Sequence, residues 1–436
     1  MRLDVIEKLL CPYCGSKLGL IHTFVEQKGE VIYGIIGCSC SEYPVLGGVG
    51  VLRREKETKR AVESLRKKHY LEALNHAIKW ERFPGFSDLI KNPMGFLLGI
   101  TNFVNSAPRS ANALNLDTFT FTQIIKKLGL GRFGNYLIHR FSLHTFWNTY
   151  ALLPLVYESE GPILDFGCGA GHSSFVFSHF FQPRNHFCVD VNLLNLILTK
   201  KYFANAQTIC VSSTATLPFK DNFFSTVFSL DCFHYVKFKS KMAQEFERVL
   251  GRDGTIIMPH LHNSLMFNIA AGNPLRGSDY SKLFKDSNIK TFPEDVLLKS
   301  FLFKNSINLD KTYSDAEVDS SRSVTVVAGA PKRLKNYSGV KRYIRSMTNF
   351  LIVNPLYESV RTNEKYIFNM KYPRHRGFTD YSFLEEYYLT DKILPKRIAI
   401  KREIVESINT KLCDSDKKIR DDLIDSFVLI NAPRRY

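Results

Sequence analysis

The chain has 436 residues, 44% of them hydrophobic and 23% charged, which is ordinary for a globular protein and excludes wholesale disorder. No run approaches the roughly 18 to 20 apolar residues that a membrane-spanning helix needs, and the first residues lack a signal peptide's apolar core, so we expect no transmembrane segment and a cytoplasmic location. The net charge of +17 favours an anionic partner, such as RNA, a nucleotide-linked sugar or a membrane surface, without choosing among them. Without an export signal, the nine cysteines suit metal binding better than stable disulfides.

Four cysteines mark the first part of the chain, residues 1–55. Cys11 and Cys14 stand in CPYC, Cys38 and Cys40 stand in CSC, and strand-like GEVIYGIIG lies between the pairs. Four thiolates from two short loops are typical of a closed tetrahedral site for structural Zn²⁺, and reduced cysteines without a metal are the alternative. The segments LLCPYCGSKL and CSCSEYPVLGGVGVL resemble the small zinc-binding activator protein of tRNA and release-factor methyltransferases. The resemblance implies a zinc-tied β unit that stabilises a catalytic domain, and it does not by itself indicate an RNA substrate.

Three further parts follow along the chain. Residues 56–153 show apolar positions at mixed three and four spacing, which predicts a helical linker or cap. In residues 154–333 the apolar runs PILDF, HFCVDV, QTICV, STVFSL, GTIIMP and SVTVVAGAP alternate with helical segments, which indicates a mostly parallel sheet with helices on both faces. Residues 334–436 form a basic C-terminal extension to which the sequence assigns no fold. The predicted fold class is therefore α/β, a Rossmann-like sheet with a small N-terminal β unit, a helical insert and a C-terminal extension.

A glycine-rich turn follows the first of these strands. Residues 163–174 read ILDFGCGAGHSS, with Gly167, Gly169 and Gly171 at alternate positions. In a parallel sheet, ligands bind beyond the carboxyl ends of the strands, where such a turn lies. The spacing G-x-G-x-G differs from the dinucleotide fingerprint, and His172 stands where a phosphate-binding loop would need lysine. The turn therefore predicts a ligand other than a dinucleotide or the phosphates of a nucleotide.

Four motifs in residues 161–332 resemble those of class I S-adenosylmethionine-dependent methyltransferases, particularly the branch that includes ubiquinone-biosynthesis enzymes and many small-molecule methyltransferases. They are ILDFGCGAG, HFCVDVN, TATLPFKDNFFSTVFSLDCFHYV and EFERVLGRDGTIIMP, in the family's order and at suitable spacing. The resemblance implies the class I methyltransferase fold and S-adenosyl-L-methionine as the methyl donor.

The same resemblance assigns residues to the cofactor. The glycines would let backbone N–H groups approach the methionine portion, Asp165 would orient the loop or accept from the amino group, and Asp190 would bind the ribose hydroxyls. Ser213 departs from the family, because relatives usually carry there the aspartate that meets the adenine amino group. The expected cofactor-binding set is Asp165, Gly167, Cys168, Gly169, Gly171, Asp190, Val191, Ser213, Thr214, Leu217 and Asp231.

Candidate catalytic residues follow the fourth and fifth strands. Methyl transfer from a sulfonium is an in-line displacement, so a base is needed only where the acceptor must lose a proton. His234, His260, His262 and Asn263 are the candidates, and the alternative is that each hydrogen-bonds backbone or packs in the wall. The three histidines could also hold a metal, but the sequence shows no carboxylate paired with them.

Three functions remain open. The first is methyl transfer to a small or medium-sized metabolite, such as a glycan or a secondary-metabolite precursor. The second is methylation of tRNA or rRNA, which the net charge and the cysteine unit support, although no RNA-binding module is recognisable. The third is a non-catalytic scaffold that binds S-adenosylmethionine, which the departure at Ser213 suggests.

Overall fold

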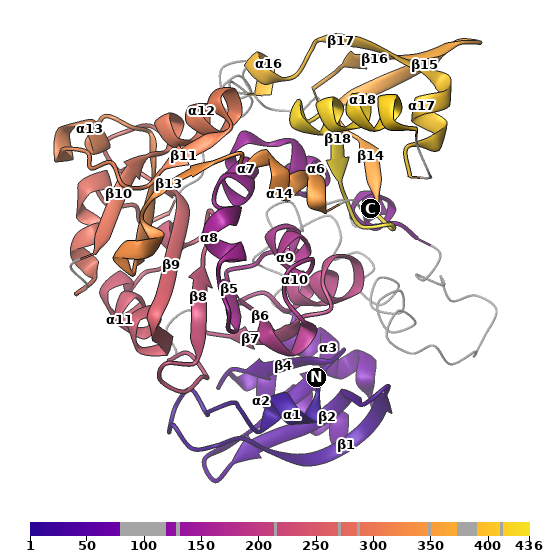
Figure 1. Cartoon of the computed structure of the whole chain (residues 1–436). Coiled ribbons are helices and arrows are strands. Elements are labelled where there is room, and N and C mark those ends of the chain that lie inside the picture. The colour runs from indigo at the N-terminus through magenta and orange to yellow at the C-terminus, as the bar shows by residue number, and fades with distance from the viewer. Residues whose placement is uncertain are drawn as a thin grey trace.

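The computed structural model describes residues 1–78, 119–127, 131–212, 216–268, 272–285, 288–347, 350–372, 390–409 and 413–436. These residues are built around one eleven-stranded sheet with the strand order β1-β2-β3-β4-β7-β6-β5-β8-β9-β12-β10 (Figure 1). In the described part of the chain, no helix has the length and apolar character that crossing a membrane requires.

Five parallel strands form the centre of the sheet. They are β5 (Ile163–Phe166), β6 (His186–Asp190), β7 (Gln207–Val211), β8 (Phe224–Phe228) and β9 (Leu250–His262). The first three are buried along their whole length, because helices cover both faces of the sheet. This arrangement confirms the predicted α/β, Rossmann-like class.

Two antiparallel strands complete the sheet beyond β9. Strand β12 (Ser323–Gly329) pairs with β9, and β10 (Ile289–Pro293) pairs with β12 at the sheet edge. The sequence predicts β12 but not β10. Strand β10 reads IKTFP, and only its last two residues are fully buried, so it lacks the continuous apolar run of an inner strand.

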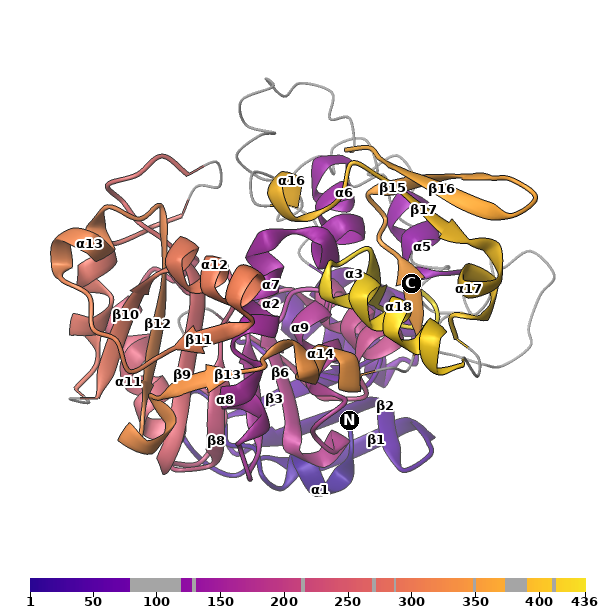
Figure 2. The same cartoon turned by 45° about the horizontal axis from the view of Figure 1, so that its top comes forward.

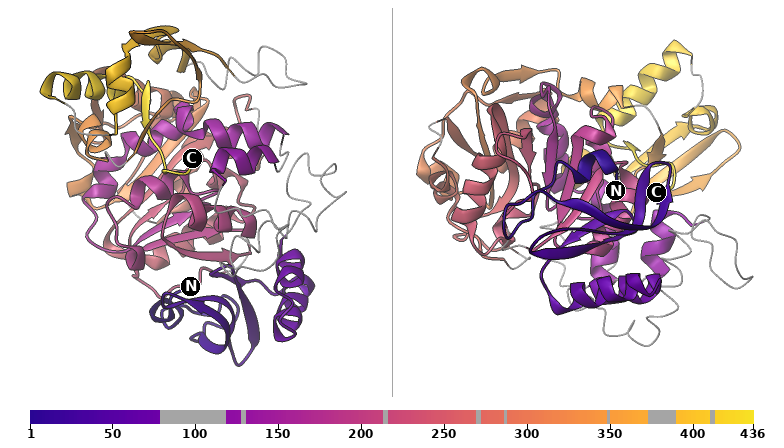
Figure 3. Two further views of the ribbon diagram at one scale, coloured as in Figure 1. Left: turned by 90° about the vertical axis from the view of Figure 1, so that its right-hand side faces the viewer. Right: turned by 90° about the horizontal axis from the view of Figure 1, so that it is seen from below.

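The N-terminal strands extend the opposite edge. They are β1 (Gly19–Gln27), β2 (Glu30–Cys38), β3 (Ser41–Leu46) and β4 (Val49–Leu52), which form an antiparallel meander. Strand β4 pairs in parallel with β7, with Gly50 opposite Ile209. The cysteine-bearing strands therefore continue the central sheet, and they lie at one end of the molecule (Figure 3).

Helices pack on both faces of the sheet over two hydrophobic cores. One core includes α1 (Leu3–Ile6) and α11 (Lys239–Val249), and the other includes the remaining helices of this region. Those remaining helices are α2 (Lys56–Arg66), α3 (Tyr70–Ala77), α5 (Phe121–Lys127), α6 (Gly131–His139), α7 (His144–Ala151), α8 (Leu153–Tyr157), α9 (His172–Phe177), α10 (Leu193–Leu198) and α12 (Glu294–Lys304).

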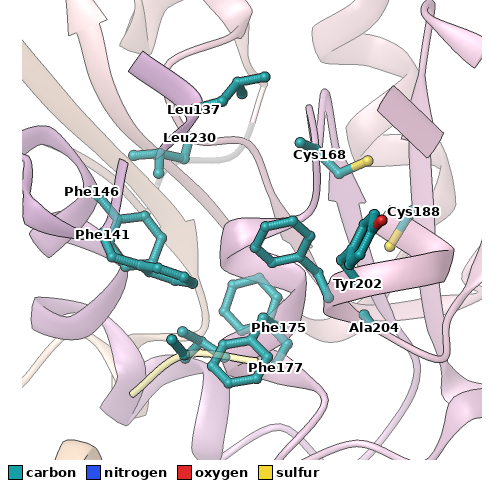
Figure 4. Packing of buried hydrophobic residues seen from close by; sticks show 14 of the residues in the cluster. Leu137, Phe141, Phe146, Cys168, Phe175, Phe177, Cys188, Tyr202, Ala204 and Leu230 are labelled. Atoms are coloured by element: carbon teal, nitrogen blue, oxygen red, sulfur yellow. The ribbon is translucent and has the colours of Figure 1, made fainter. Parts of the chain in front are cut away.

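Aromatic side chains from α7, from the 3-10 turn Arg140–Ser142 before it and from α9 fill the core beside the glycine turn. Phe141 and Phe146 lie edge to face with ring centroids 5.0 Å apart, and Phe175 and Phe177 come from α9 (Figure 4). Edge-to-face pairs of this kind add to the stabilisation that burial itself provides. The turn therefore rests on a rigid aromatic layer.

The C-terminal extension is folded and packs against α7 (Figure 2). The Trp147 ring of α7 stacks on Phe427 with ring centroids 4.4 Å apart. The extension and the segment leading into it contain α13 (Asp315–Asp319), α14 (Lys341–Ser346), α16 (Thr390–Ile393), α17 (Arg402–Ser407), α18 (Asp414–Asp425), the pair β11 (Ser306–Asn308) and β13 (Asn336–Ser338), the pair β14 (Leu351–Val353) and β18 (Leu429–Asn431), and the sheet β15 (Tyr357–Arg361), β16 (Lys365–Met370) and β17 (Arg397–Lys401).

Candidate active site

The glycine turn between β5 and α9 adopts a backbone that requires glycine. Gly167, Gly169 and Gly171 have φ of +70°, +55° and +94°. A Cβ added to Gly167 would lie 2.0 Å from the Cys232 sulfur, which no side chain could accommodate without a shift. The turn can thus pass close to Cys232 and Thr199 only because Gly167 and Gly171 lack side chains.

Asp190 holds the turn from the end of β6. Its Oδ2 accepts the Gly169 N–H at 2.9 Å, and its Oδ1 accepts the Asn192 N–H at 2.7 Å. Both carboxylate oxygens of Asp190 therefore help to fix the backbone on either side of the strand end.

Asp165 lies deeper, at the end of β5. It accepts a hydrogen bond from the Ser174 hydroxyl at 2.5 Å, and burial raises its pKa well above the ordinary value. Its carboxyl joins β5 to α9 beneath the turn, and it also lines the cavity described next.

A cavity of about 1060 Å³ brings the two groups of predicted residues together. One side is lined by the glycine turn with Cys168 and Asp190, and the other by Asp231, His260 and His262. Six of the residues expected to bind the cofactor therefore share one space with His260 and His262; the six are Asp165, Gly167, Cys168, Gly169, Asp190 and Asp231.

Asp231 is the centre of the polar side. Its Oδ2 accepts from the Tyr136 hydroxyl at 3.1 Å and lies 3.3 Å from Arg140 Nη2. Its Oδ1 faces Nε2 of His234 and His260, each at 3.9 Å, and Nε2 of His262 at 4.0 Å. Burial alone would raise the pKa of Asp231, but the charges of His260 and Arg140 lower it to about 2. Asp231 is thus an anion surrounded by imidazole and guanidinium groups.

His260 is held by a carboxylate on its other side. Its Nδ1 lies 2.9 Å from Glu294 Oε2, at the start of α12. Burial would lower the pKa of His260, but Glu294 and Asp231 raise it above the ordinary value. Both His260, with φ of +56°, and Asp231, with φ of +53°, are in the left-handed region, a strain that clusters at functional sites.

His234 lies behind His262 and does not line the cavity. The two imidazoles stack with ring centroids 3.8 Å apart. Burial lowers the pKa of His234 to about 3, so the ring is neutral. Among the described residues, neither of its ring nitrogens has a hydrogen-bond partner.

Four further candidates, Gly171, Val191, Leu217 and Asn263, do not line the cavity. Asn263 uses its amide to bond Asp319 and Ser321 carbonyls, both at 2.8 Å, and so braces a loop. The Leu217 side chain is buried in the α11 core, and the Val191 carbonyl accepts from Arg53 at 3.4 Å. Ser213 and Thr214 lie outside the described residues.

Three residues on the polar side of the cavity could not be identified from the sequence. Tyr136 and Arg140 come from the helical segment before β5, and Glu294 comes from the helix after β10. Each reaches Asp231 or His260 only through the tertiary fold, and none belongs to a motif. Glu294 occupies the first turn of a helix, where acidic residues are common for reasons of the helix dipole alone.

The four N-terminal cysteines converge. Their sulfur atoms lie within 4.8 Å of one another, with Cys40 Sγ 3.2 Å from Cys14 Sγ and 3.5 Å from Cys11 Sγ. Four free thiols at one point, two of them exposed, are the donor set of a structural zinc site, so the residues fit the metal.

Parts of the chain are similar to known proteins. Residues 164–258 match the family model of the methyltransferase domain. A S-adenosylmethionine-dependent methyltransferase from Aquifex aeolicus is 15% identical with a TM-score of 0.33, over 47% of this chain and 96% of that one. Phosphoethanolamine N-methyltransferase 2 from Haemonchus contortus, solved with S-adenosylhomocysteine, is 16% identical with a TM-score of 0.31, over 42% and 53%. YcgJ from Bacillus subtilis is 17% identical with a TM-score of 0.28, over 41% and 96%. No curated protein matches the chain.

The domain match and the sheet define the class of this protein. It is an S-adenosylmethionine-dependent methyltransferase with a Rossmann-like class I fold. It therefore binds S-adenosylmethionine together with a methyl acceptor.

Proposed function

We propose that this enzyme methylates a hydroxyl or another nucleophile of a small or medium-sized metabolite, such as a glycan or a secondary-metabolite precursor. The observation that supports the proposal is the single cavity that joins the glycine turn to the Asp231 cluster. Ligand sites commonly measure about 300 to 1,000 Å³, so about 1060 Å³ suits the cofactor together with a compact acceptor.

The cofactor would occupy the glycine side. The backbone of the glycine turn would lie against its methionine portion, and the carboxylate of Asp190 at the end of β6 would bind the ribose hydroxyls. Asp165 would keep the turn in place through Ser174. The sulfonium methyl would then point toward the polar side of the cavity.

The acceptor would occupy the side of Asp231, His260 and His262. Alignment of nucleophile, methyl carbon and sulfur supplies much of the rate enhancement in a displacement of this kind. The imidazoles would activate the acceptor hydroxyl by accepting its hydrogen bond or its proton, with Asp231 stabilising the positive charge that results.

The cysteine cluster would bind structural Zn²⁺ through Cys11, Cys14, Cys38 and Cys40. Metal analysis of the purified chain should find one zinc atom that is lost in Cys14→Ser. The matched control is Cys413→Ser, which removes an exposed cysteine outside the cluster and should retain the metal. Zinc retained in both variants would reject this assignment.

Methyl transfer from labelled S-adenosylmethionine tests the acceptor class. The enzyme is incubated separately with a metabolite fraction and with an RNA fraction, and we expect label in the metabolites. Label in RNA alone would instead establish RNA methylation, the second candidate, which the net charge of +17 favours. In that case RNA affinity should fall steeply with salt, since cationic groups would displace counterions from phosphates.

A further inference from the structure

The two oxygens of Asp231 face different partners. Oδ2 accepts a hydrogen bond from Tyr136 at 3.1 Å and lies 3.3 Å from Arg140, whereas the groups that Oδ1 faces among the described residues are imidazole nitrogens. The Nε2 atoms of His260 and His262 lie 3.9 Å and 4.0 Å from Oδ1. These separations are too long for hydrogen bonds.

The same separations suit donors that share one ion. Two donors that each lie about 2.1 Å from an ion can be at most about 4.2 Å apart. The donor atoms of Asp231, His260 and His262 all lie within 4.8 Å of one another, so a small contraction would close the site. Two imidazoles and one carboxylate form a donor set that divalent transition metals prefer, with further positions left open for a substrate.

Neighbouring groups orient the donors toward this point. Glu294 accepts from His260 Nδ1 at 2.9 Å, which fixes the tautomer whose Nε2 lone pair faces Oδ1. Carboxylates hold metal-binding histidines in this manner. His234 is fully buried, stacks on His262, and directs Nε2 to the same Oδ1 from 3.9 Å, with no hydrogen-bond partner among the described residues. A polar group left without a partner at such depth indicates a missing group nearby.

The local charge also allows a cation. Asp231 and Glu294 each contribute one negative charge. Arg140, which contacts Asp231 at Oδ2 and not at Oδ1, contributes one positive charge. The cluster is therefore anionic when the imidazoles are neutral, and a divalent ion would be attracted rather than repelled.

We propose that Asp231 Oδ1, His260 Nε2 and His262 Nε2 bind a divalent transition-metal ion that receives the oxygen of the methyl acceptor. The inference rests on the proposed function, and it replaces direct proton uptake by the imidazoles with activation by the ion. The acceptor oxygen binds the metal, and its proton leaves to water because the ion makes the hydroxyl more acidic. The oxygen then attacks the methyl carbon, the carbon–sulfur bond breaks, and its electron pair leaves with S-adenosylhomocysteine.

Cobalt provides a direct test in the full chain. The cysteine cluster is first filled with one equivalent of Zn²⁺, and Co²⁺ is then added while calorimetry and the visible spectrum are recorded. We expect one further ion per chain, with d–d bands but without the near-ultraviolet band of cobalt bound to sulfur. Asp231→Asn and His262→Gln should each weaken Co²⁺ binding at least tenfold, and Glu294→Gln about tenfold. His22→Ala, which removes an exposed histidine on β1, should change nothing.

The outcomes separate this inference from the methyltransferase function. Absence of Co²⁺ binding to the zinc-filled chain, or equal binding in Asp231→Asn and the native chain, would overturn the metal site. Circular dichroism of the same samples reports whether each variant is folded, and calorimetry with S-adenosylmethionine reports cofactor binding separately. If Asp231→Asn fails to fold, Glu294→Gln and His262→Gln decide the question. A chain that binds Co²⁺ but not S-adenosylmethionine would support the metal site and reject the cofactor assignment.

Discussion

Gly167 is the residue of the turn with the least room for change. The backbone φ of Gly167 is +70°, and a Cβ added there would lie 2.0 Å from Cys232 Sγ. A Cβ added at Gly169 would have no neighbouring atom within 4 Å. Gly169→Ala should therefore cost only the backbone strain, about 1–2 kcal/mol of the free energy of unfolding. Gly167→Ala should cost about 1–3 kcal/mol more, because Cys232 must move. Denaturant unfolding of both variants measures the difference, and equal losses would contradict the turn geometry.

His262 lines the cavity, while its neighbour His234 is fully enclosed. His262→Ala should reduce kcat about 100-fold, within the range that loss of an activating group produces. Cofactor affinity should change less than about twofold, because His262 lies on the acceptor side. Steady-state kinetics and calorimetry measure the two quantities, with His22→Ala as the control. Unchanged turnover would remove His262 from the catalytic groups.

For single residues of the site, the sequence predicts those that belong to a motif and misses those that reach the site only through packing. The turn glycines and Asp190 lie in motifs that resemble those of the methyltransferase family, and His260 and His262 lie at the end of the last of these motifs and of β9. The sequence places Asp231 with the cofactor, and the structure adds its contacts with Tyr136 and Arg140. These contacts join positions about ninety residues apart, and no local pattern encodes them.

Helix α9 begins with His172, which donates from Nε2 to the Leu137 carbonyl of α6 at 3.0 Å. Aromatic rings surround its imidazole, among them Phe141 and Tyr436. Burial and the nearby charge of Arg140 lower its pKa well below the ordinary value. The unfolded chain binds a proton below about pH 6.5 and the folded chain does not, so His172 stabilises the fold above that pH and its contribution is lost as the pH falls.

His172→Gln should make stability less sensitive to acid, because glutamine can still donate to Leu137 but does not titrate. Between pH 6.5 and 5 the slope of the free energy of unfolding should decrease by up to about 1.4 kcal/mol per pH unit. Urea unfolding at several pH values measures this slope. The same slope in His172→Gln and in the native chain would contradict the proposed burial effect.

Among the elements, the inner parallel strands are the most predictable from the sequence. They are buried on both faces and therefore read as continuous apolar runs. Edge strand β10 lacks this pattern. The pairing of β4 with β7 also cannot be predicted from the sequence. It joins Gly50 to Ile209, and it depends on which edge of the central sheet is left for a further strand.

At the scale of the whole molecule, the C-terminal extension packs on the helices before β5. Phe427 is fully buried and stacks on Trp147 of α7. Phe427→Ala should lower the free energy of unfolding by about 3–5 kcal/mol, as expected for a large aromatic side chain in a core. Val360→Ala, at a position 56% exposed on β15, should cost less than about 0.5 kcal/mol. Similar losses for both would show that the extension does not stabilise the fold.

The central claim is that the glycine turn and Asp190 bind S-adenosylmethionine in the shared cavity. Isothermal titration of the cofactor into the native chain and into Asp190→Ala tests it most directly. We predict one molecule bound per chain, and affinity at least tenfold lower in Asp190→Ala because charge-assisted hydrogen bonds of about 1.5–3 kcal/mol are lost. Absence of binding to the native chain, or equal affinity in the variant, would contradict the claim.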